Sequence, residues 1–277
     1  MGQSIDPDPN SATTALLTPA TFLALALLPL LLIAAASRRW PTGQDLALRR
    51  SLSARDLVVV AAGFIVSHLI FWALSFLGEP QPDQTTLFFE EMGLAGPLAP
   101  AVAQMLSVVI LAPVCEELLY RGFILRPTHD ALARRGARVM AVVVSISVST
   151  LAFALPHIGD DTTTAEILGY LVTGITFGLV YVLTGSMTAV MVAHSLQSAW
   201  VMAQVLLFGH GGQAVSPVHY ILAFGAPVFV YLIAQGLRAI LPSGERPVAG
   251  GGSPRAADRT PDPSLRLLEP RAQALST

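Results

Sequence analysis

The sequence predicts an all-α fold, a polytopic membrane helix bundle of about seven transmembrane helices. Of its 277 residues, 53% are hydrophobic and only 12% are charged, and the mean hydropathy is +0.62. Ordinary soluble domains carry about 25% charged residues. Seven apolar runs also follow one another along the chain, each close to the ~20 residues that a helix needs to cross a bilayer.

The chain divides into three parts. Residues 1–14 form a polar N-terminal segment, residues 15–240 hold the apolar runs, and residues 241–277 are rich in Pro, Gly, Arg and Asp. This last composition is typical of a disordered tail. The predicted spans are 16–36, 57–77, 94–114, 139–155, 167–183, 187–208 and 220–240.

The charges between the spans predict an orientation. Arg-rich loops follow the first and third spans, whereas the loops after the second and fourth spans are acidic. Basic residues are enriched in cytoplasmic loops, so we expect the N-terminus outside and the C-terminus in the cytoplasm. The protein would be integral to a membrane, most simply the plasma membrane of a bacterium. The only cysteine, Cys115, excludes an internal disulfide and a Cys-based zinc site.

One motif is charged although the sequence around it is apolar. Its residues Glu116, Glu117 and Arg121 follow the third apolar run directly. Ionisable residues at membrane depth are costly and indicate function by default. On a helix, Glu117 and Arg121 lie one turn apart and can pair, while Glu116 points about 100° away. Pairing explains Glu117 but leaves Glu116 without a partner. A purely structural alternative is an ion pair at a helix bend, since Pro113 would free the carbonyl of Val109.

Two histidines on other spans could join Glu116. His157 follows Phe153 at the end of the fourth span, and His194 lies inside the sixth span, four residues before Ser198. Such groups permit hydrolysis in two ways. A metal ion held by His157, His194 and Glu116 could activate water. Alternatively, Glu116 could deprotonate water without a metal, with the histidines stabilising the developing oxyanion.

The remaining histidines are expected to have ordinary roles. His68, within the second span, is interpreted as a packing residue between helices. His129 falls in the Arg-rich loop and should be solvated. His210 and His219 flank a Gly-rich outer loop and should be exposed, although loop histidines could bind a metal.

The ordered set Glu-Glu-x-x-x-Arg at 116–121, Phe-x-x-x-His at 153–157 and a membrane histidine at 194 resembles a known family. It is similar to the CAAX prenyl protease and bacteriocin-processing (CPBP, Abi) family of intramembrane endopeptidases. The resemblance covers a core of about residues 101–200. The third family motif usually has Asn four residues after the histidine, whereas this chain has Ser198, whose hydroxyl lacks the second donor of an amide.

The resemblance implies a membrane-embedded protease, a glutamate- or metal-type hydrolase that acts on a peptide or protein at the bilayer, with no nucleic acid involved. Glu116 would activate water, and Glu117 would assist or be held by Arg121. His157 and His194 would act as metal ligands, with Zn²⁺ as the metal, or as oxyanion-stabilising groups without one. The alternatives are a binding or scaffold relative with weak or no activity, which Ser198 favours, and a small-solute transporter.

The predicted span limits carry a geometric difficulty. They place Glu116 near the cytoplasmic end of the third span and His157 near the outer end of the fourth. The two side chains can meet only if these limits shift. The third helix could continue through Leu125, so that Glu116 lies deeper in the membrane, and residues 134–138 could extend the fourth helix well beyond the inner surface. A shift of five or six residues would move a side chain by ~8 Å along a helix.

Overall fold

A computed structural model describes residues 38–49, 51–76, 84–159 and 162–241, together with several positions between 24 and 35. In this part of the chain the regular structure is helical and contains no strand. The helices are α2 (Ala54–Leu74), α3 (Gln84–Glu91), α4 (Leu98–Leu106), η1 (Ser107–Leu111), α5 (Ala112–Glu117), η2 (Leu118–Leu125), α6 (Arg126–Ala133), α7 (Arg138–Ala154), η3 (Leu155–His157), α8 (Thr164–Thr184), α9 (Met187–Phe208) and α10 (Pro217–Ile240).

The prediction of an all-α membrane bundle is confirmed. Six helices among the described residues are long and apolar enough to cross a bilayer, and each overlaps one of the predicted spans. The predicted span 16–36 lies mostly outside the described residues, and its few described positions are helical. The N-terminal segment 1–14 and the tail beyond Leu241 also lie outside them. The protein is an integral membrane protein.

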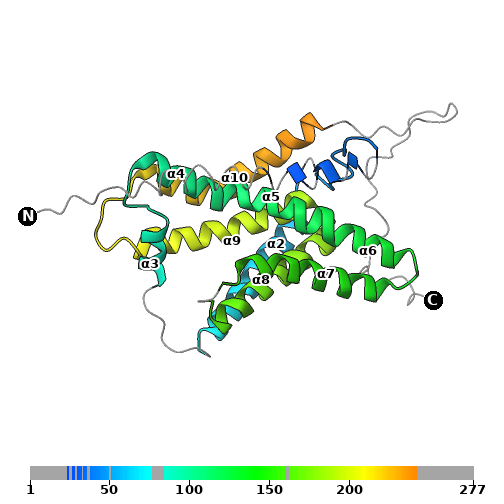
Figure 1. Ribbon diagram of the computed structural model, residues 1–277, viewed down its shortest axis with the longest axis horizontal. Helices are drawn as coiled ribbons and strands as arrows, with labels where there is room; N and C mark the ends of the chain where they lie inside the picture. Colours follow the sequence, from blue (N-terminus) through cyan, green and yellow to red (C-terminus); the bar gives the residue numbers. More distant parts are fainter. Residues whose placement is uncertain are drawn as a thin grey trace, which may run out of the picture.

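The third span is much longer than predicted. It runs from Leu98 to Ala133 as one helix of 36 residues, about 54 Å at 1.5 Å per residue, and Figure 1 shows α4, α5 and α6 crossing the molecule in one line. The limit at residue 114 was wrong because the charges of the following motif are buried by neighbouring helices and do not end the helix. Glu116 therefore lies near the middle of this helix. A site shared with His157 depends on this longer helix.

Two π-helical stretches interrupt this long helix. They are η1 and η2, and Pro113 and Pro127 follow them closely. Proline lacks the N–H that would bond four residues back, and the carbonyl of Val109 instead accepts a hydrogen bond from the hydroxyl of Ser195 at 2.8 Å. The carbonyl of Val109, which cannot bond to Pro113, thus has a donor on α9. Single π turns within α-helices are frequent at functional sites.

Two glycines allow α7 and α8 to approach closely. A Cβ at Gly174 would lie 2.9 Å from Cγ2 of Thr150, and one at Gly178 would lie 3.1 Å from Cγ2 of Ile146. The spacing Gly-x-x-x-Gly is the small-residue pattern that brings membrane helices together. Helix α8 is therefore in close contact with α7, which leads into the η3 turn that carries His157.

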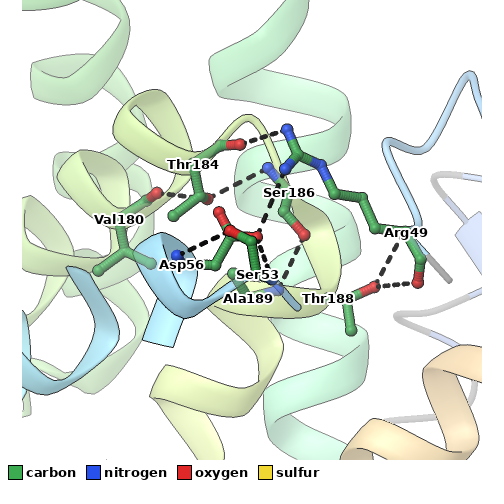
Figure 2. A network of polar contacts seen from close by, with 8 residues as sticks. All are labelled: Arg49, Ser53, Asp56, Val180, Thr184, Ser186, Thr188 and Ala189. Carbon is green, nitrogen blue, oxygen red and sulfur yellow. Dashed lines mark hydrogen bonds and ion pairs between the residues drawn. The ribbon is translucent and has the colours of Figure 1, made fainter. Parts of the chain in front are cut away.

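One end of the bundle is tied together by Arg49. Its guanidinium donates to the carbonyl of Thr184 at 2.5 Å and lies 3.4 Å from Asp56, and its backbone N–H donates to the hydroxyl of Thr188 at 3.1 Å. Figure 2 shows these partners converging from the start of α2 and from the α8–α9 turn. The Arg-rich segment after the first predicted span is therefore docked against the bundle.

Candidate active site

Glu117 and Arg121 form the predicted pair. A guanidinium nitrogen of Arg121 donates to Oε1 of Glu117 at 2.9 Å, and both side chains are 0% exposed. Breaking such a buried pair by removing one partner typically costs about 3–5 kcal/mol, because a buried charge is left uncompensated. The pair is therefore a fixed part of the helix core, as the sequence predicted.

Arg121 also connects the pair to two other helices. Its second terminal nitrogen donates to the backbone carbonyl of Gly174 on α8 at 3.0 Å. Its guanidinium carbon lies 5.2 Å from the ring centroid of Phe153 and 5.4 Å from that of Phe177. Cation–π contacts at this distance stabilise a desolvated guanidinium. Phe153, the first residue of the Phe-x-x-x-His motif, thus contacts Arg121 directly.

His194 contacts Glu117. Its Nδ1 lies 2.8 Å from Oε1 of Glu117, the atom that Arg121 also contacts. A carboxylate only accepts, so in this hydrogen bond Nδ1 carries the proton, and Nε2 is not used by Glu117. The ring stacks on Phe177, with centroids 4.5 Å apart and an interplanar angle of 29°. Glu117 is therefore the residue that orients His194.

His157 is held at the end of α7. Its Nδ1 lies 2.8 Å from the carbonyl of Phe153 and donates to it, which again leaves Nε2 free to act. The imidazole is 4.9 Å from the ring of Phe153 and 4.8 Å from the ring of Tyr170. The ring of His157 is thus in contact with one residue of α7 and one of α8.

Glu116 completes the cluster. Its side chain is 8% exposed, and its buried Oε2 has no hydrogen-bond partner among the described residues. It interacts electrostatically with His194, His157 and Arg121. The carboxylate on α5 and the imidazoles on η3 and α9 are therefore close enough to interact electrostatically.

Ser198 and Cys115 have no visible role in this cluster. Ser198 lies one turn beyond His194 on α9, is half-buried and forms no hydrogen bond with any described residue. Cys115 is a buried free thiol beside Glu116, as expected of a small packing residue.

The predicted zinc ion would need His157, His194 and Glu116 as its ligands. Among the described residues, no three His, Cys, Asp or Glu side chains are grouped so that they could hold a metal. Nδ1 of the two histidines is engaged by Glu117 and by the carbonyl of Phe153, so each ring has Nε2 available, as metal-bound histidines usually do. The zinc ion stays a prediction, and no chemical step is derived through it.

Three residues of α8 that the sequence analysis did not single out contact the site, namely Tyr170, Gly174 and Phe177. The Gly-x-x-x-Gly spacing at 174–178 was a usable signal for close helix packing. The two aromatic residues had no such signal, because an aromatic residue in an apolar helix usually packs in the core or against lipid.

The other histidines gave mixed outcomes. His68 packs against Trp200 with ring centroids 5.8 Å apart, which confirms it as a packing residue. The expectation of a solvated His129 was wrong, because this residue lies in α6 and is 1% exposed. His219 is likewise buried, at 2% exposed, because α10 begins before it and carries it into the bundle.

The segment that carries the site matches a known family. Residues 98–200 match the model of the Type II CAAX prenyl endopeptidase Rce1-like family. The match is a similarity of this segment to that family. The matched range agrees closely with the core of 101–200 suggested by the sequence motifs, and this confirms the resemblance to CAAX and bacteriocin-processing endopeptidases.

A curated relative supports the same relationship. The chain is 32% identical over 100 residues to the membrane-embedded CAAX protease MroQ of Staphylococcus aureus (strain USA300). The aligned stretch covers 36% of this chain and 38% of that protein. Comparison with solved structures gave no match. The similarity to Rce1-like proteins and to MroQ is therefore a similarity of the core that holds Glu116, His157 and His194.

Proposed function

We propose that this protein is an intramembrane endopeptidase of the CAAX-protease and bacteriocin-processing type, in which Glu116 activates the water that cleaves a peptide bond. The observation that carries the proposal is the contrast between the two glutamates. Oε1 of Glu117 is engaged by both Arg121 and His194, whereas Glu116 is buried, makes no hydrogen bond with a described residue and interacts electrostatically with both imidazoles. A buried carboxylate without a hydrogen-bond partner is costly and is suited to accept a proton from water.

The reaction can be written with the residues of this chain. Glu116 takes a proton from water, and the water oxygen forms a bond to the scissile carbonyl carbon. The oxyanion that develops accepts a hydrogen bond from His157. Because Nδ1 of His157 donates to Phe153, only the imidazolium form can also donate from Nε2. The C–N bond then breaks, and Glu116 passes its proton to the leaving amine.

The remaining groups hold the reacting ones in place. Glu117 accepts from both Arg121 and His194, and Arg121 is anchored on the carbonyl of Gly174. Preorganised dipoles and charges of this kind need no rearrangement when the transition state forms. His194 is not assigned the role of a base, because its Nδ1 is already bonded to Glu117. We assign it to orienting water or substrate through Nε2.

The proposal extends to substrate and orientation. The substrate is a peptide or protein that reaches the site from the bilayer or its cytoplasmic side, and a prenylated CAAX peptide is the first probe because of the family match. The N-terminus is outside and the C-terminus cytoplasmic, as the distribution of arginine predicts.

Replacement Glu116→Gln tests the mechanism, since an amide of the same shape cannot accept the proton. In proteoliposomes we expect cleavage of the prenylated CAAX peptide to fall at least about 10²-fold, the usual contribution of a general base. In cell membranes, N-terminal proteomics should show new protein termini with the wild type and lose them with the variant.

The matched control is Glu90→Gln, which alters an exposed carboxylate on α3 and should leave cleavage unchanged. Both variants should insert and melt like the wild type. Full activity of Glu116→Gln would reject the mechanism. A wild type that yields neither peptide cleavage nor new termini would favour the alternative of a binding or scaffold relative.

A further inference from the structure

One face of α8 contacts three side chains of the candidate site, His157, Arg121 and His194. Tyr170, Gly174 and Phe177 are spaced four and three residues apart, so they share a face of the helix. Tyr170 contacts His157, the carbonyl of Gly174 accepts from Arg121, and Phe177 contacts His194. Neither the sequence motifs nor the proposed reaction assigns a role to Tyr170 or Phe177.

The contact of Tyr170 fixes the ring of His157 from α8. The two ring centroids are 4.8 Å apart at an interplanar angle of 35°, and Phe153 contacts the same imidazole at 4.9 Å and 35°. Among the described residues, Phe153 and Tyr170 make no ring contact with each other. The imidazole therefore contacts one aromatic ring from α7 and a separate one from α8, which restricts its rotation.

The contact of Phe177 does the same for His194. Its ring stacks on that imidazole with centroids 4.5 Å apart and also lies 5.4 Å from the guanidinium carbon of Arg121. The buried ring of Phe177 thus packs on the two side chains that share Oε1 of Glu117. Stacking on the ring and the hydrogen bond to Glu117 together define the direction of Nε2 of His194.

The helix that carries these residues is itself firmly placed. Thr163 and Glu166 form a capping box at its start, with the Glu166 N–H donating to Thr163 at 3.3 Å and the Thr163 N–H to Glu166 at 2.7 Å. Further along, Gly174 and Gly178 hold it against α7. Rings on a helix fixed at both points can position a neighbouring group precisely enough for catalysis.

We propose that Tyr170 and Phe177 are positioning residues, which hold Nε2 of His157 and of His194 toward the substrate by aromatic stacking from α8. The proposal rests on the proposed function, because it assigns the histidines to the same reaction. What each position requires is an aromatic ring, so the Tyr170 hydroxyl is dispensable and Phe177 tolerates a tyrosine.

The test is a set of paired substitutions in the full-length protein in proteoliposomes, with the prenylated CAAX peptide as substrate. Tyr170→Leu and Phe177→Leu should lower kcat about 10–100-fold with little change in KM, since small misplacements of catalytic groups have effects of this size. Tyr170→Phe and Phe177→Tyr should restore kcat to near the wild-type value. Leu179→Ala, at an exposed position of α8, is the matched control and should leave kcat unchanged.

A spectroscopic readout separates positioning from general damage to the fold. In protein labelled with ¹⁵N-histidine, the ring-nitrogen signals of His157 should shift and broaden in Tyr170→Leu and return in Tyr170→Phe, while the melting temperature of both stays close to that of Leu179→Ala. Leucine variants with wild-type kcat and unchanged histidine signals would overturn the proposal. If Glu116→Gln abolishes cleavage in the same experiment, only the role of α8 is then wrong, and the proposed reaction stands.

Discussion

At the scale of single residues, the two adjacent glutamates have different surroundings. Glu117 shares one oxygen with Arg121 and His194 and is fully buried. Both glutamates have a buried Oε2 without a partner among the described residues, but Glu116 also lacks the two contacts that Glu117 makes through Oε1. The helical rotation of about 100° per residue separates a structural carboxylate from one available for chemistry.

Ser198 is the residue where the chain departs from the family pattern, and Ser198→Asn is the corresponding test. Asn has two amide donors where Ser has one hydroxyl donor, and Ser198 forms no hydrogen bond with a described residue. We expect the substitution to raise kcat several-fold, measured on the prenylated CAAX peptide, if an oxyanion donor is missing here. An unchanged or lower kcat would show that the site is complete with serine.

At the scale of elements, the long helix Leu98–Ala133 and its contact with α8 decide the geometry of the site. The helix continues through Glu116 and Arg121 because Gly174 supplies a backbone acceptor and close packing supplies aromatic partners. Without a side chain at residue 174, α7 and α8 approach closely enough to bury the guanidinium.

Two glycines of α8 make a matched pair for testing this contact. A Cβ at Gly174 would meet Thr150 at 2.9 Å and its Cα at 3.1 Å, whereas a Cβ at Gly169 would meet nothing within 4 Å. Gly174→Ala should destabilise the protein by about 1–3 kcal/mol, the usual cost of overpacking. Gly169→Ala should be neutral or stabilise by up to about 1 kcal/mol through helix propensity.

Thermal unfolding in one detergent provides the measurement for both glycines. Cleavage activity should fall with Gly174→Ala, because Arg121 would lose its position. Equal stability of the two variants would contradict the role given to the α7–α8 contact.

At the scale of the whole molecule, the orientation in the membrane follows from charges at the helix ends. The single native cysteine permits a clean test in the Cys115→Ala background, with Glu90→Cys and Arg134→Cys introduced separately at exposed positions. A membrane-impermeant maleimide added to intact cells should label residue 90 and leave residue 134 unlabelled until the membrane is permeabilised. The reverse pattern would invert the proposed topology.

The metal requirement is also a property of the assembled site. No three donor side chains are grouped for metal binding among the described residues, so we expect purified protein to cleave its peptide at an undiminished rate after treatment with 1,10-phenanthroline. Metal analysis of the same sample should give less than one zinc per chain. Loss of activity on chelation, with recovery on adding zinc, would instead support the metal-dependent route with His157, His194 and Glu116 as ligands.

The sequence alone determined the membrane bundle, the Glu117–Arg121 pair and the candidate groups Glu116, His157 and His194, because hydropathy, helical periodicity and motif order are local properties. It did not determine where the third helix ends, that His194 bonds to Glu117, or that α8 supplies Tyr170, Gly174 and Phe177. Those features depend on which helices pack together. A buried charge continues a helix only when distant residues satisfy it, and only the tertiary structure brings those residues into contact.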